Sequence, residues 1–321
     1  MPDPTPNGTD NILRPRNLQD YIGQPLMIQR LNIAIKAAKF RGEAMPHVLF
    51  HGAPGLGKTS AANLIAGAMG STLHTTSAPA LEKVIDVLHV LVTLKPRDVW
   101  FIDEIHRLPP TVEEILYPVL EDSRVDVLVN GAVINIPLPP FTLVGATTRA
   151  GGLSAPFRDR FGIVARLEYY PPEDLADIVS RSARILAVTI GPCHVLEIAK
   201  RARGTPRIAN NLLARVRDFA CGQAVTADML DTTFQLEGID ATGMNELDRA
   251  YLACLKDQYK GGPTGVNALA ASLNEAKETL ENVVEPFLLY HHRIGRTPRG
   301  RVLLDTAAQP VAQPSEDPTH A

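Results

Sequence analysis

The segment HVLFHGAPGLGKTS, residues 47–60, constrains the fold of this chain more than any other feature. Within it, residues 52–59 match the pattern G-x-x-x-x-G-K-[ST]. The apolar residues before the glycines are typical of a buried strand, and the amphipathic pattern after them predicts a helix from Lys58 to about Met69. A strand, a glycine-rich turn and a helix in this order predict the P-loop of an α/β fold, because backbone N–H groups and a helix N-terminus together bind phosphate.

The residues of this loop have separate expected roles. Gly55 and Gly57 allow the backbone to bend so that successive N–H groups face phosphate oxygens. Lys58 would meet the outer phosphates of a nucleotide, and the Thr59 hydroxyl would hold Mg²⁺. The loop therefore predicts a site for a nucleotide with Mg²⁺.

Acidic and hydroxyl side chains end two later apolar strands. Asp103 and Glu104 end the strand in DVWFIDE, where a carboxylate of a P-loop fold reaches Mg²⁺ and a following glutamate polarises the attacking water. His106 completes the motif DEIH, but a histidine at a strand end is more often structural. The strand in FTLVGATT ends in Thr147, whose hydroxyl can hold the attacking water if this strand lies beside the P-loop strand. These residues predict nucleotide hydrolysis.

The composition restricts where the chain acts and what it meets. The net charge of −3 argues against a surface that is positive throughout, so any contact with nucleic acid has to be local. The segment RIGRTPRGR, residues 293–301, carries four arginines and is either a solvated cluster or a DNA-binding patch. No long apolar run or secretory signal appears, and the three cysteines are scattered singly. We therefore expect a cytosolic protein without a membrane segment, a disulfide framework or a zinc site.

Residues 125–137 predict a β-hairpin, because alternating apolar residues flank the pair Asn130-Gly131, which a tight type I′ turn favours. This hairpin is either a plain surface element or a docking finger for a partner, and near its tip it is expected to expose Val129, Ala132 or Val133.

Seven motifs, in order along the chain, resemble those of the RuvB family. They are GAPGLGKTS, FIDEIHRL, EEILYPVLED, PPFTLVGATTRAG, APFRDRFGI, RARGTPRIANNLL and RTPRGR, and the resemblance extends from Leu13 to about Arg301. RuvB proteins are bacterial AAA+ motors that drive branch migration of Holliday junctions in recombination and repair. The resemblance implies a cytoplasmic, homohexameric, DNA-dependent ATPase that uses ATP and Mg²⁺, acts on double-stranded DNA, and works with a RuvA-like junction-binding protein and a RuvC-like resolvase.

The resemblance also implies roles for residues that the local sequence leaves open. Arg160, in FRDRFG, is the finger that one subunit inserts into its neighbour's nucleotide site to stabilise charge on the transferred phosphoryl group, and Arg158 supports it. Arg207 is the second sensor, which reaches the phosphates from a helical lid, and Thr147 is the first sensor. The positions that match the family's nucleotide site are Leu13, Arg14, Gly55, Gly57, Lys58, Thr59, Ser60, Glu121, Asp122, Ser123, Tyr170 and Arg207. The expected catalytic residues are Lys58, Asp103, Glu104, Thr147, Arg160 and Arg207, with Thr59 and Asp103 on the metal.

The C-terminal part has a different pattern from the helical lid. Three short helices followed by a Gly- and Pro-containing ribbon predict a winged helix, in which the resemblance assigns DNA contact to Lys277, Arg296 and Arg301. The predicted parts are a non-packing N-terminus (1–10), an AAA+ P-loop ATPase domain (11–170), a helical lid (171–240), a winged-helix DNA-binding domain (241–304) and a non-packing tail (305–321).

Some features depart from the family's usual pattern. Ala53, Ser123 and Lys277 stand where proline, an aromatic residue and arginine are common, and the hairpin, which docks on RuvA in the family, looks short. The leading hypothesis is an ATP-driven translocase that moves Holliday junctions. The alternative is a nucleotide-gated DNA-binding or assembly switch, a diverged paralogue with little translocation. A clamp-loader-like ATPase fits less well, because its last domain would usually be a helical collar.

Overall fold

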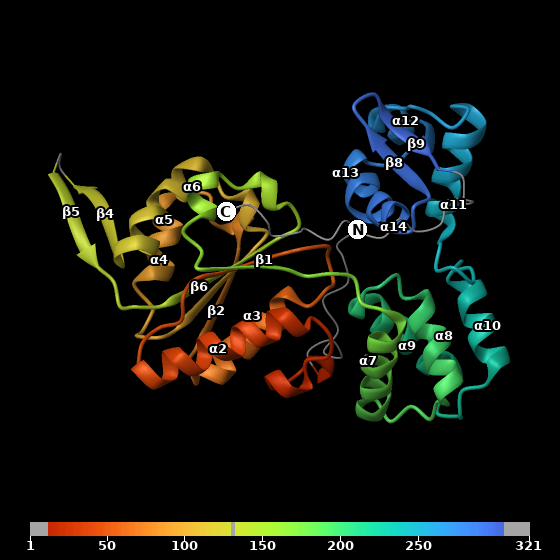
Figure 1. The fold of residues 1–321 in the computed structure, drawn as a ribbon, viewed down its shortest axis with the longest axis horizontal. Coiled ribbons are helices and arrows are strands. Elements are labelled where there is room, and N and C mark those ends of the chain that lie inside the picture. The colour runs from red at the N-terminus through yellow and green to blue at the C-terminus, as the bar shows by residue number, and fades with distance from the viewer. Residues whose placement is uncertain (1–11, 130–131, 305–321) are drawn as a thin grey trace, which may run out of the picture. The chain divides into compact units, whose positions relative to one another are not determined.

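A computed structural model of the protein describes residues 12–129 and 132–304 (Figure 1). The predicted non-packing ends, 1–10 and 305–321, lie outside these residues, as do the turn Asn130-Gly131 and the side chains of residues 127–133, including the tip residues singled out above. The described chain forms two compact units that divide between Met229 and Leu230. The finer domain bounds drawn from the sequence stay predictions.

The first unit is built on a five-stranded parallel sheet with the order β2-β3-β6-β1-β7. The strands are β1 (Val48–His51), β2 (Leu73–Ser77), β3 (Val99–Asp103), β6 (Thr142–Thr147) and β7 (Ile163–Arg166). The P-loop strand β1 pairs with β6 on one side and β7 on the other, so the expectation that the strand ending in Thr147 neighbours it is confirmed. Because the strands are parallel, the P-loop, Asp103 and Thr147 all lie at the carboxyl edge of the sheet, where open α/β sheets bind ligands.

Helices cover both faces of this sheet (Figure 1). Helix α3 (Lys58–Met69), which has the predicted bounds, packs beside α2 (Pro25–Arg41) on one face. On the other face lie α4 (Val84–Leu91) and α5 (Pro110–Asp122), and their apolar residues share one buried cluster with Trp100 and Ile102 of β3. The central strands are buried on both faces, which explains why they read as continuous apolar runs rather than as alternating patterns.

The predicted hairpin is present as β4 (Arg124–Val129) and β5 (Ala132–Pro137), which pair antiparallel and project away from the sheet (Figure 1). Ile134 and Ile136 are both exposed on its second strand. After β6, a short helix α6 (Ala155–Arg158) leads into the predicted finger segment and then into β7.

The lid within the first unit is helical, as predicted. Helices α7 (Pro172–Ile185), α8 (Pro192–Arg201) and α9 (Pro206–Ala220) pack on one another, and α10 (Ala227–Leu236) continues the chain across the division between the units. Each of α7, α8 and α9 has proline in its first turn, where the missing N–H costs no intrahelical hydrogen bond.

The second unit contains the predicted short helices and ribbon. Its helices are α11 (Glu246–Ala253), α12 (Val266–Leu273), α13 (Lys277–Thr279) and α14 (Glu285–Tyr290), and its ribbon is the antiparallel pair β8 (Ile294–Thr297) and β9 (Gly300–Leu303). Two π-helical turns, Cys254–Gln258 and Leu280–Val284, extend α11 and join α13 to α14. A separate apolar core that includes Tyr251, Leu255 and Leu288 holds this unit together.

Candidate functional site

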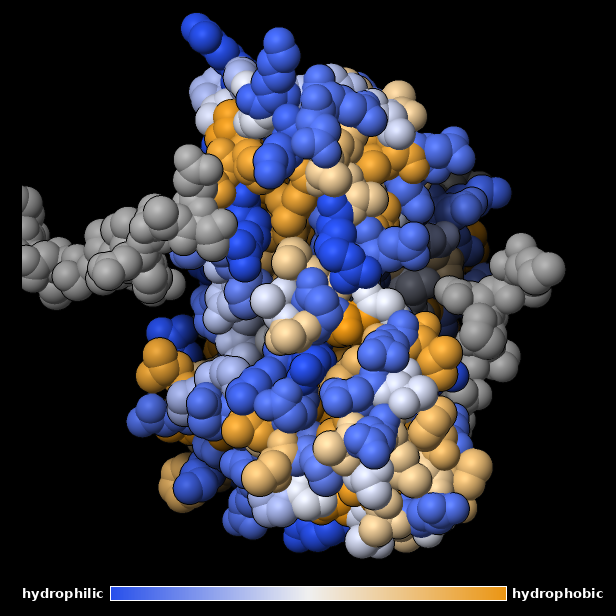
Figure 2. Space-filling model, turned by 90° about the vertical axis from the view of Figure 1, so that its right-hand side faces the viewer, coloured by the Kyte–Doolittle hydropathy of each residue, from blue (hydrophilic) through white to orange (hydrophobic). Residues whose placement is uncertain are grey.

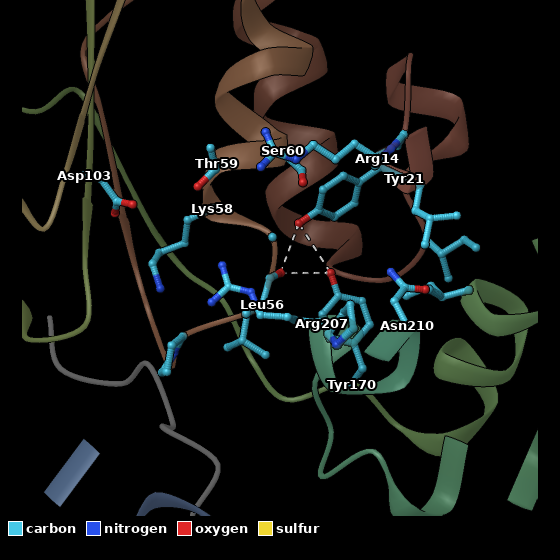
Figure 3. Close-up of a pocket in the computed structure, with 18 of the residues that line it drawn as sticks. Arg14, Tyr21, Leu56, Lys58, Thr59, Ser60, Asp103, Tyr170, Arg207 and Asn210 are labelled. Carbon is cyan, nitrogen blue, oxygen red and sulfur yellow. Dashed lines mark hydrogen bonds between the residues drawn. The ribbon is translucent and has the colours of Figure 1, made fainter. Parts of the chain in front are cut away.

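The P-loop, the lid helices α7 and α9 and the N-terminal arm line one cavity in the first unit (Figure 3). Eleven residues that the sequence assigned to nucleotide, metal or catalysis line it. They are Leu13, Arg14, Gly55, Gly57, Lys58, Thr59, Ser60, Asp103, Glu104, Tyr170 and Arg207. The cavity therefore brings together residues from distant parts of the sequence, as one binding site for an extended polar ligand requires.

Two of the three P-loop glycines, Gly55 and Gly57, line the cavity and have close neighbours there. Gly55 has φ +80°, and a Cβ added there would lie 2.7 Å from Cγ2 of Thr205 in the lid. Gly57 has φ +101°, and a Cβ there would lie 2.7 Å from the hydroxyl oxygen of Tyr21. Gly57 is also the N-cap of α3, and no side chain caps that helix. The first N–H groups of α3 are thus left to a ligand, an arrangement that fits a phosphate group.

Lys58 lies on the floor of this loop with its side chain buried. Its Nζ donates hydrogen bonds to the carbonyl oxygens of Gly52 and Ala53, each at 2.8 Å. Burial lowers the pKa of Lys58 to about 8, although the negative charges of Asp103 and Glu104 act in the opposite direction and raise it. The ammonium group is poorly solvated and is bonded only to neutral carbonyls, so a polyanion in the cavity would stabilise its charge.

The two strand-end acids take different backbone positions. Asp103 is the last residue of β3, and its Oδ1 accepts the N–H of Glu104 at 2.9 Å. Glu104 has left-handed backbone geometry, with φ 52°, which is uncommon for a residue other than glycine. Thr59 and Asp103 line the same cavity and offer one hydroxyl and one carboxylate, a donor set that suits Mg²⁺ because this ion usually keeps waters and takes few protein ligands.

Thr147 is placed differently from the sequence expectation. Its side chain is fully buried, and the neighbouring Thr148, rather than Thr147, lines the cavity. The Thr147 hydroxyl oxygen accepts the N–H of Arg149 at 2.9 Å and lies 2.9 Å from Nδ1 of His106. The hydroxyl is therefore engaged within the protein.

Arg207 reaches the cavity from the start of α9, and its side chain extends toward Lys58 (Figure 3). The backbone N–H of Arg207 donates to the carbonyl oxygen of Gly55 at 3.4 Å. This hydrogen bond joins the lid to the P-loop close to the side chains of Lys58 and Arg207. A change in lid angle would move Arg207 relative to the loop.

Tyr21, Arg181 and Asn210 line the cavity without a recognisable sequence signal, whereas Tyr170 was expected there. The hydroxyls of Tyr21 and Tyr170 lie 3.4 and 3.3 Å from the carbonyl oxygen of Leu56, to which each can donate, and the Tyr170 hydroxyl can also donate to that of Tyr21 (Figure 3). Arg181 of α7 donates to the carbonyl oxygens of Leu13 and Asp20, both at 2.7 Å, and so ties the N-terminal arm to the lid. Asn210 of α9, also on the cavity wall, accepts a hydrogen bond from Ser182 on α7.

The remaining predicted nucleotide residues lie outside the cavity lining. Glu121, Asp122 and Ser123 end α5, and Arg160 follows α6. An Oε1 of Glu121 is 2.9 Å from Nη2 of Arg160, and the guanidinium carbon lies 4.4 Å from the centroid of the Tyr117 ring. Arg160 is therefore held in a defined position near Glu121.

In the second unit, two of the three predicted DNA residues share a buried partner. Glu285 is fully buried, and its carboxylate accepts hydrogen bonds from Arg296, Arg301 and the Tyr251 hydroxyl. Burial raises the pKa of Tyr251, so its hydroxyl stays protonated and donates. The Arg296 side chain is 48% exposed but that of Arg301 only 15%, and Lys277 is exposed at the start of α13.

On the face drawn in Figure 2, hydrophilic and hydrophobic residues are interspersed. Among residues 12–129 and 132–304, no helix has the length and apolar character needed to cross a bilayer.

Three RuvB family models match successive parts of the chain. They are the Holliday junction DNA helicase RuvB P-loop domain over residues 13–167, the RuvB AAA lid domain over 170–240 and the RuvB C-terminal winged helix domain over 241–311. Among solved structures, the RuvB Holliday junction branch migration motor of Thermotoga maritima is 44% identical, with a TM-score of 0.85 and coverage of 92% of this chain and 97% of that chain. A point mutant of the same Thermotoga protein gives a TM-score of 0.86 at 44% identity, with coverage of 92% and 97%.

Proposed function

This chain belongs to the RuvB family of ATP-driven Holliday-junction branch-migration motors, and we propose that it performs this work with the cavity, lid and winged helix described above. It is an ATP hydrolase that acts on junction DNA. The observation that carries the residue assignment is the single cavity in which the P-loop, the strand-end acids and the lid arginine meet. Each of these three parts performs a different task in phosphoryl transfer.

Phosphate binding falls to the P-loop and the lid. The uncapped N–H groups of α3, the Lys58 ammonium and the Arg207 guanidinium surround the place where the outer phosphates would lie. Donors held around the phosphates in this way would need little rearrangement when charge shifts toward the leaving phosphate oxygen. Thr59 and Asp103 would hold Mg²⁺, which neutralises phosphate charge when bound.

Activation of the attacking water falls to Glu104. Its carboxylate follows the metal-side acid directly in the chain and lines the same cavity. A carboxylate there would accept a proton from water as it attacks the terminal phosphate. Thr147 belongs to the same group of catalytic residues in our proposal, although it is buried behind the cavity wall.

The finger side of the first unit would serve a neighbouring subunit. Arg160, Glu121, Asp122 and Ser123 are absent from the lining of their own chain's cavity, among the residues that the structure describes. That separation supports action in trans, in which these residues meet the nucleotide of the next subunit in a homohexamer. The Tyr117 ring and Glu121 orient the Arg160 guanidinium, and Arg158 would support the same interface.

DNA and the partner proteins would bind surface residues outside the cavity. Lys277, Arg296 and Arg301 would contact the phosphates of double-stranded DNA, which position a duplex without reading its bases. The exposed Ile134 and Ile136 on the hairpin offer an apolar contact for a RuvA-like protein, and a RuvC-like resolvase would meet the same junction. A bacterial cytoplasmic location follows from this substrate.

The test is ATP turnover by the purified full-length protein, alone, with linear duplex and with a synthetic four-way junction, beside an Arg160→Ala variant. We expect DNA to stimulate turnover and the variant to lose roughly 10³-fold or more of it while still binding ATP. Mixed into wild-type rings, the variant is expected to depress their activity. Normal turnover by Arg160→Ala would remove the finger assignment, and tight binding of ATP and DNA without turnover would indicate a nucleotide-gated switch.

A further inference from the structure

His106 stands between two residues of the proposed catalytic group. It lies in the short 3₁₀ helix Ile105–Arg107, directly after β3, and its side chain is only 11% exposed. Its Nδ1 lies 2.9 Å from the Thr147 hydroxyl oxygen, and its Nε2 lies 3.5 Å from a carboxylate oxygen of Glu104. The imidazole thus spans from a buried threonine on β6 to the carboxylate that lines the cavity.

The contacts of the two ring nitrogens together favour one tautomer of His106. The Thr147 hydroxyl can donate its proton to Nδ1 of His106 while its oxygen accepts the N–H of Arg149. The ring proton then lies on Nε2 and faces Glu104. The opposite tautomer would turn the Nε2 lone pair toward a carboxylate, which is repulsive.

The charges around the ring favour the same arrangement. Burial lowers the pKa of His106, Glu104 and Asp103 raise it, and Arg149 and Arg107 lower it further, so that the net direction is downward. The imidazole is therefore neutral at pH 7, with one donor and one acceptor. That leaves one nitrogen for Thr147 and the other for Glu104.

The main chain of Glu104 is fixed, but its side chain needs a contact such as that with His106 to hold one orientation. Its left-handed backbone geometry and the hydrogen bond from its N–H to Asp103 fix the main chain. The side chain itself is 37% exposed in the cavity and keeps the torsional freedom of a long carboxylate side chain, which a catalytic base has to lose.

We propose that His106 is a positioning residue through which Thr147 orients the Glu104 carboxylate for water activation. In this arrangement Thr147 contributes to hydrolysis without touching the nucleotide, because its hydroxyl is hydrogen-bonded to His106 and Arg149. The inference rests on the proposed roles of Glu104 and Thr147 in ATP hydrolysis.

The test uses ATP hydrolysis by the full-length protein with DNA present, and three changes at one position. His106→Phe keeps the ring but removes both nitrogens, His106→Gln keeps a terminal amide that can donate toward Glu104, and His106→Asn keeps a polar group only near the Thr147 end. We expect His106→Phe to lower kcat about 10- to 100-fold, with KM and the ATP dissociation constant changed less than about threefold. His106→Gln is expected to retain at least several-fold more activity than His106→Asn.

A double variant separates an indirect role of Thr147 from a direct one. If Thr147 acts through His106, the double variant Thr147→Val with His106→Phe will have the kcat of the less active single variant, within about threefold. If the two losses multiply, Thr147 acts independently and the inference is wrong.

Other outcomes also decide the matter. Unchanged kcat in His106→Phe would overturn the proposal, and so would equal losses in all three His106 variants together with a lowered melting temperature, which indicate a packing role. Glu104→Gln serves as the reference for the proposed function. If it hydrolyses ATP normally, the assignment of Glu104 fails, whereas its loss of activity beside fully active His106 variants would reject the inference alone.

Discussion

The nucleotide cavity and the wing of the second unit both gather charged residues, but they hold them in opposite ways. In the cavity, Lys58 bonds only to backbone carbonyls, and Arg207 lines the cavity with an exposed side chain that extends toward Lys58. On the wing, Arg296 and Arg301 are both bonded to the fully buried Glu285.

The difference separates two uses of positive charge. A catalytic cavity keeps its cations in place yet available, because charge on the reacting phosphate has to be met at once. A DNA-contacting wing that slides over many sequences needs less exact contacts, so its arginines can also hold the fold. We therefore expect cavity substitutions to reduce activity at constant stability, and wing substitutions to reduce both stability and DNA affinity.

The largest expected effect is at Lys58. Lys58→Met removes the ammonium but keeps a side chain of similar length on the loop. We expect ATP hydrolysis to fall about 10³-fold, equivalent to about 4 kcal/mol in the transition state. The melting temperature should stay the same or rise, because a poorly solvated charge is removed. A steady-state ATPase assay with a thermal melt measures both, and a large loss of stability would contradict this side of the comparison.

Glu285→Gln should produce the next largest effect, on stability. The change leaves Arg296 and Arg301 beside a neutral amide, and breaking a buried ion pair on one side typically costs about 3 kcal/mol or more. We expect the second unit to unfold at lower urea concentration, with ATP hydrolysis in the absence of DNA nearly unchanged. An unfolding curve that overlays the wild type would show that the wing does not depend on this carboxylate.

A half-buried histidine allows a smaller test in the first unit. Burial lowers the pKa of His47 to about 4, and its Nδ1 accepts the N–H of Leu143 at 2.9 Å. Because the folded pKa lies below the unfolded value, the unfolded chain binds the proton more readily. The contribution to stability is complete above about pH 6.5 and is lost as the pH falls toward 4.

Urea unfolding at pH 7 and pH 5 checks this expectation. We expect the wild type to lose about 1 to 2 kcal/mol more between these two pH values than His47→Gln does. The opposite order, with the variant more sensitive to acid, would show that His47 is charged in the folded protein.

The smallest expected effect distinguishes the two wing arginines. Arg296→Ala should weaken duplex binding about tenfold and reduce the salt slope by about one, as loss of one phosphate contact does. Arg301→Ala should lower the melting temperature more than Arg296→Ala, because Arg301 is the less exposed of the two. Lys277→Ala is the control, since the exposed Lys277 should affect DNA affinity alone. Equal melting temperatures for all three would contradict a structural role for Arg301.

Much of the cavity could be predicted because its residues follow local rules. The P-loop needs glycines, a lysine and a hydroxyl at fixed spacing, and Asp103 and Glu104 follow a strand whose apolar run is unmistakable. Helix α3 begins and ends where the pattern predicts. The short helices and the ribbon of the second unit were also expected from the sequence, whereas the π-helical turns within this unit were not, since no composition rule marks a single wide turn.

Other parts of the site had no local signal. Tyr21 and Arg181 reach the cavity from segments that look ordinary in sequence, and each meets its partners across more than thirty residues of chain. Thr147 was expected at the nucleotide, yet only the pairing of β6 beside β3 shows that Thr148 lines the cavity and that Thr147 faces His106.

The sequence by itself determined the P-loop, the order of strands and helices, and the residue types able to bind phosphate and metal, because these depend on spacing along one stretch of chain. Only the tertiary structure decided which charged side chains can contact a ligand and which are paired with other side chains of the protein. Arg160 and Glu121, Arg296 and Glu285, and His106 between Glu104 and Thr147 come from separate segments. Whether such groups meet depends on how the elements pack, and burial then sets the strength of each contact.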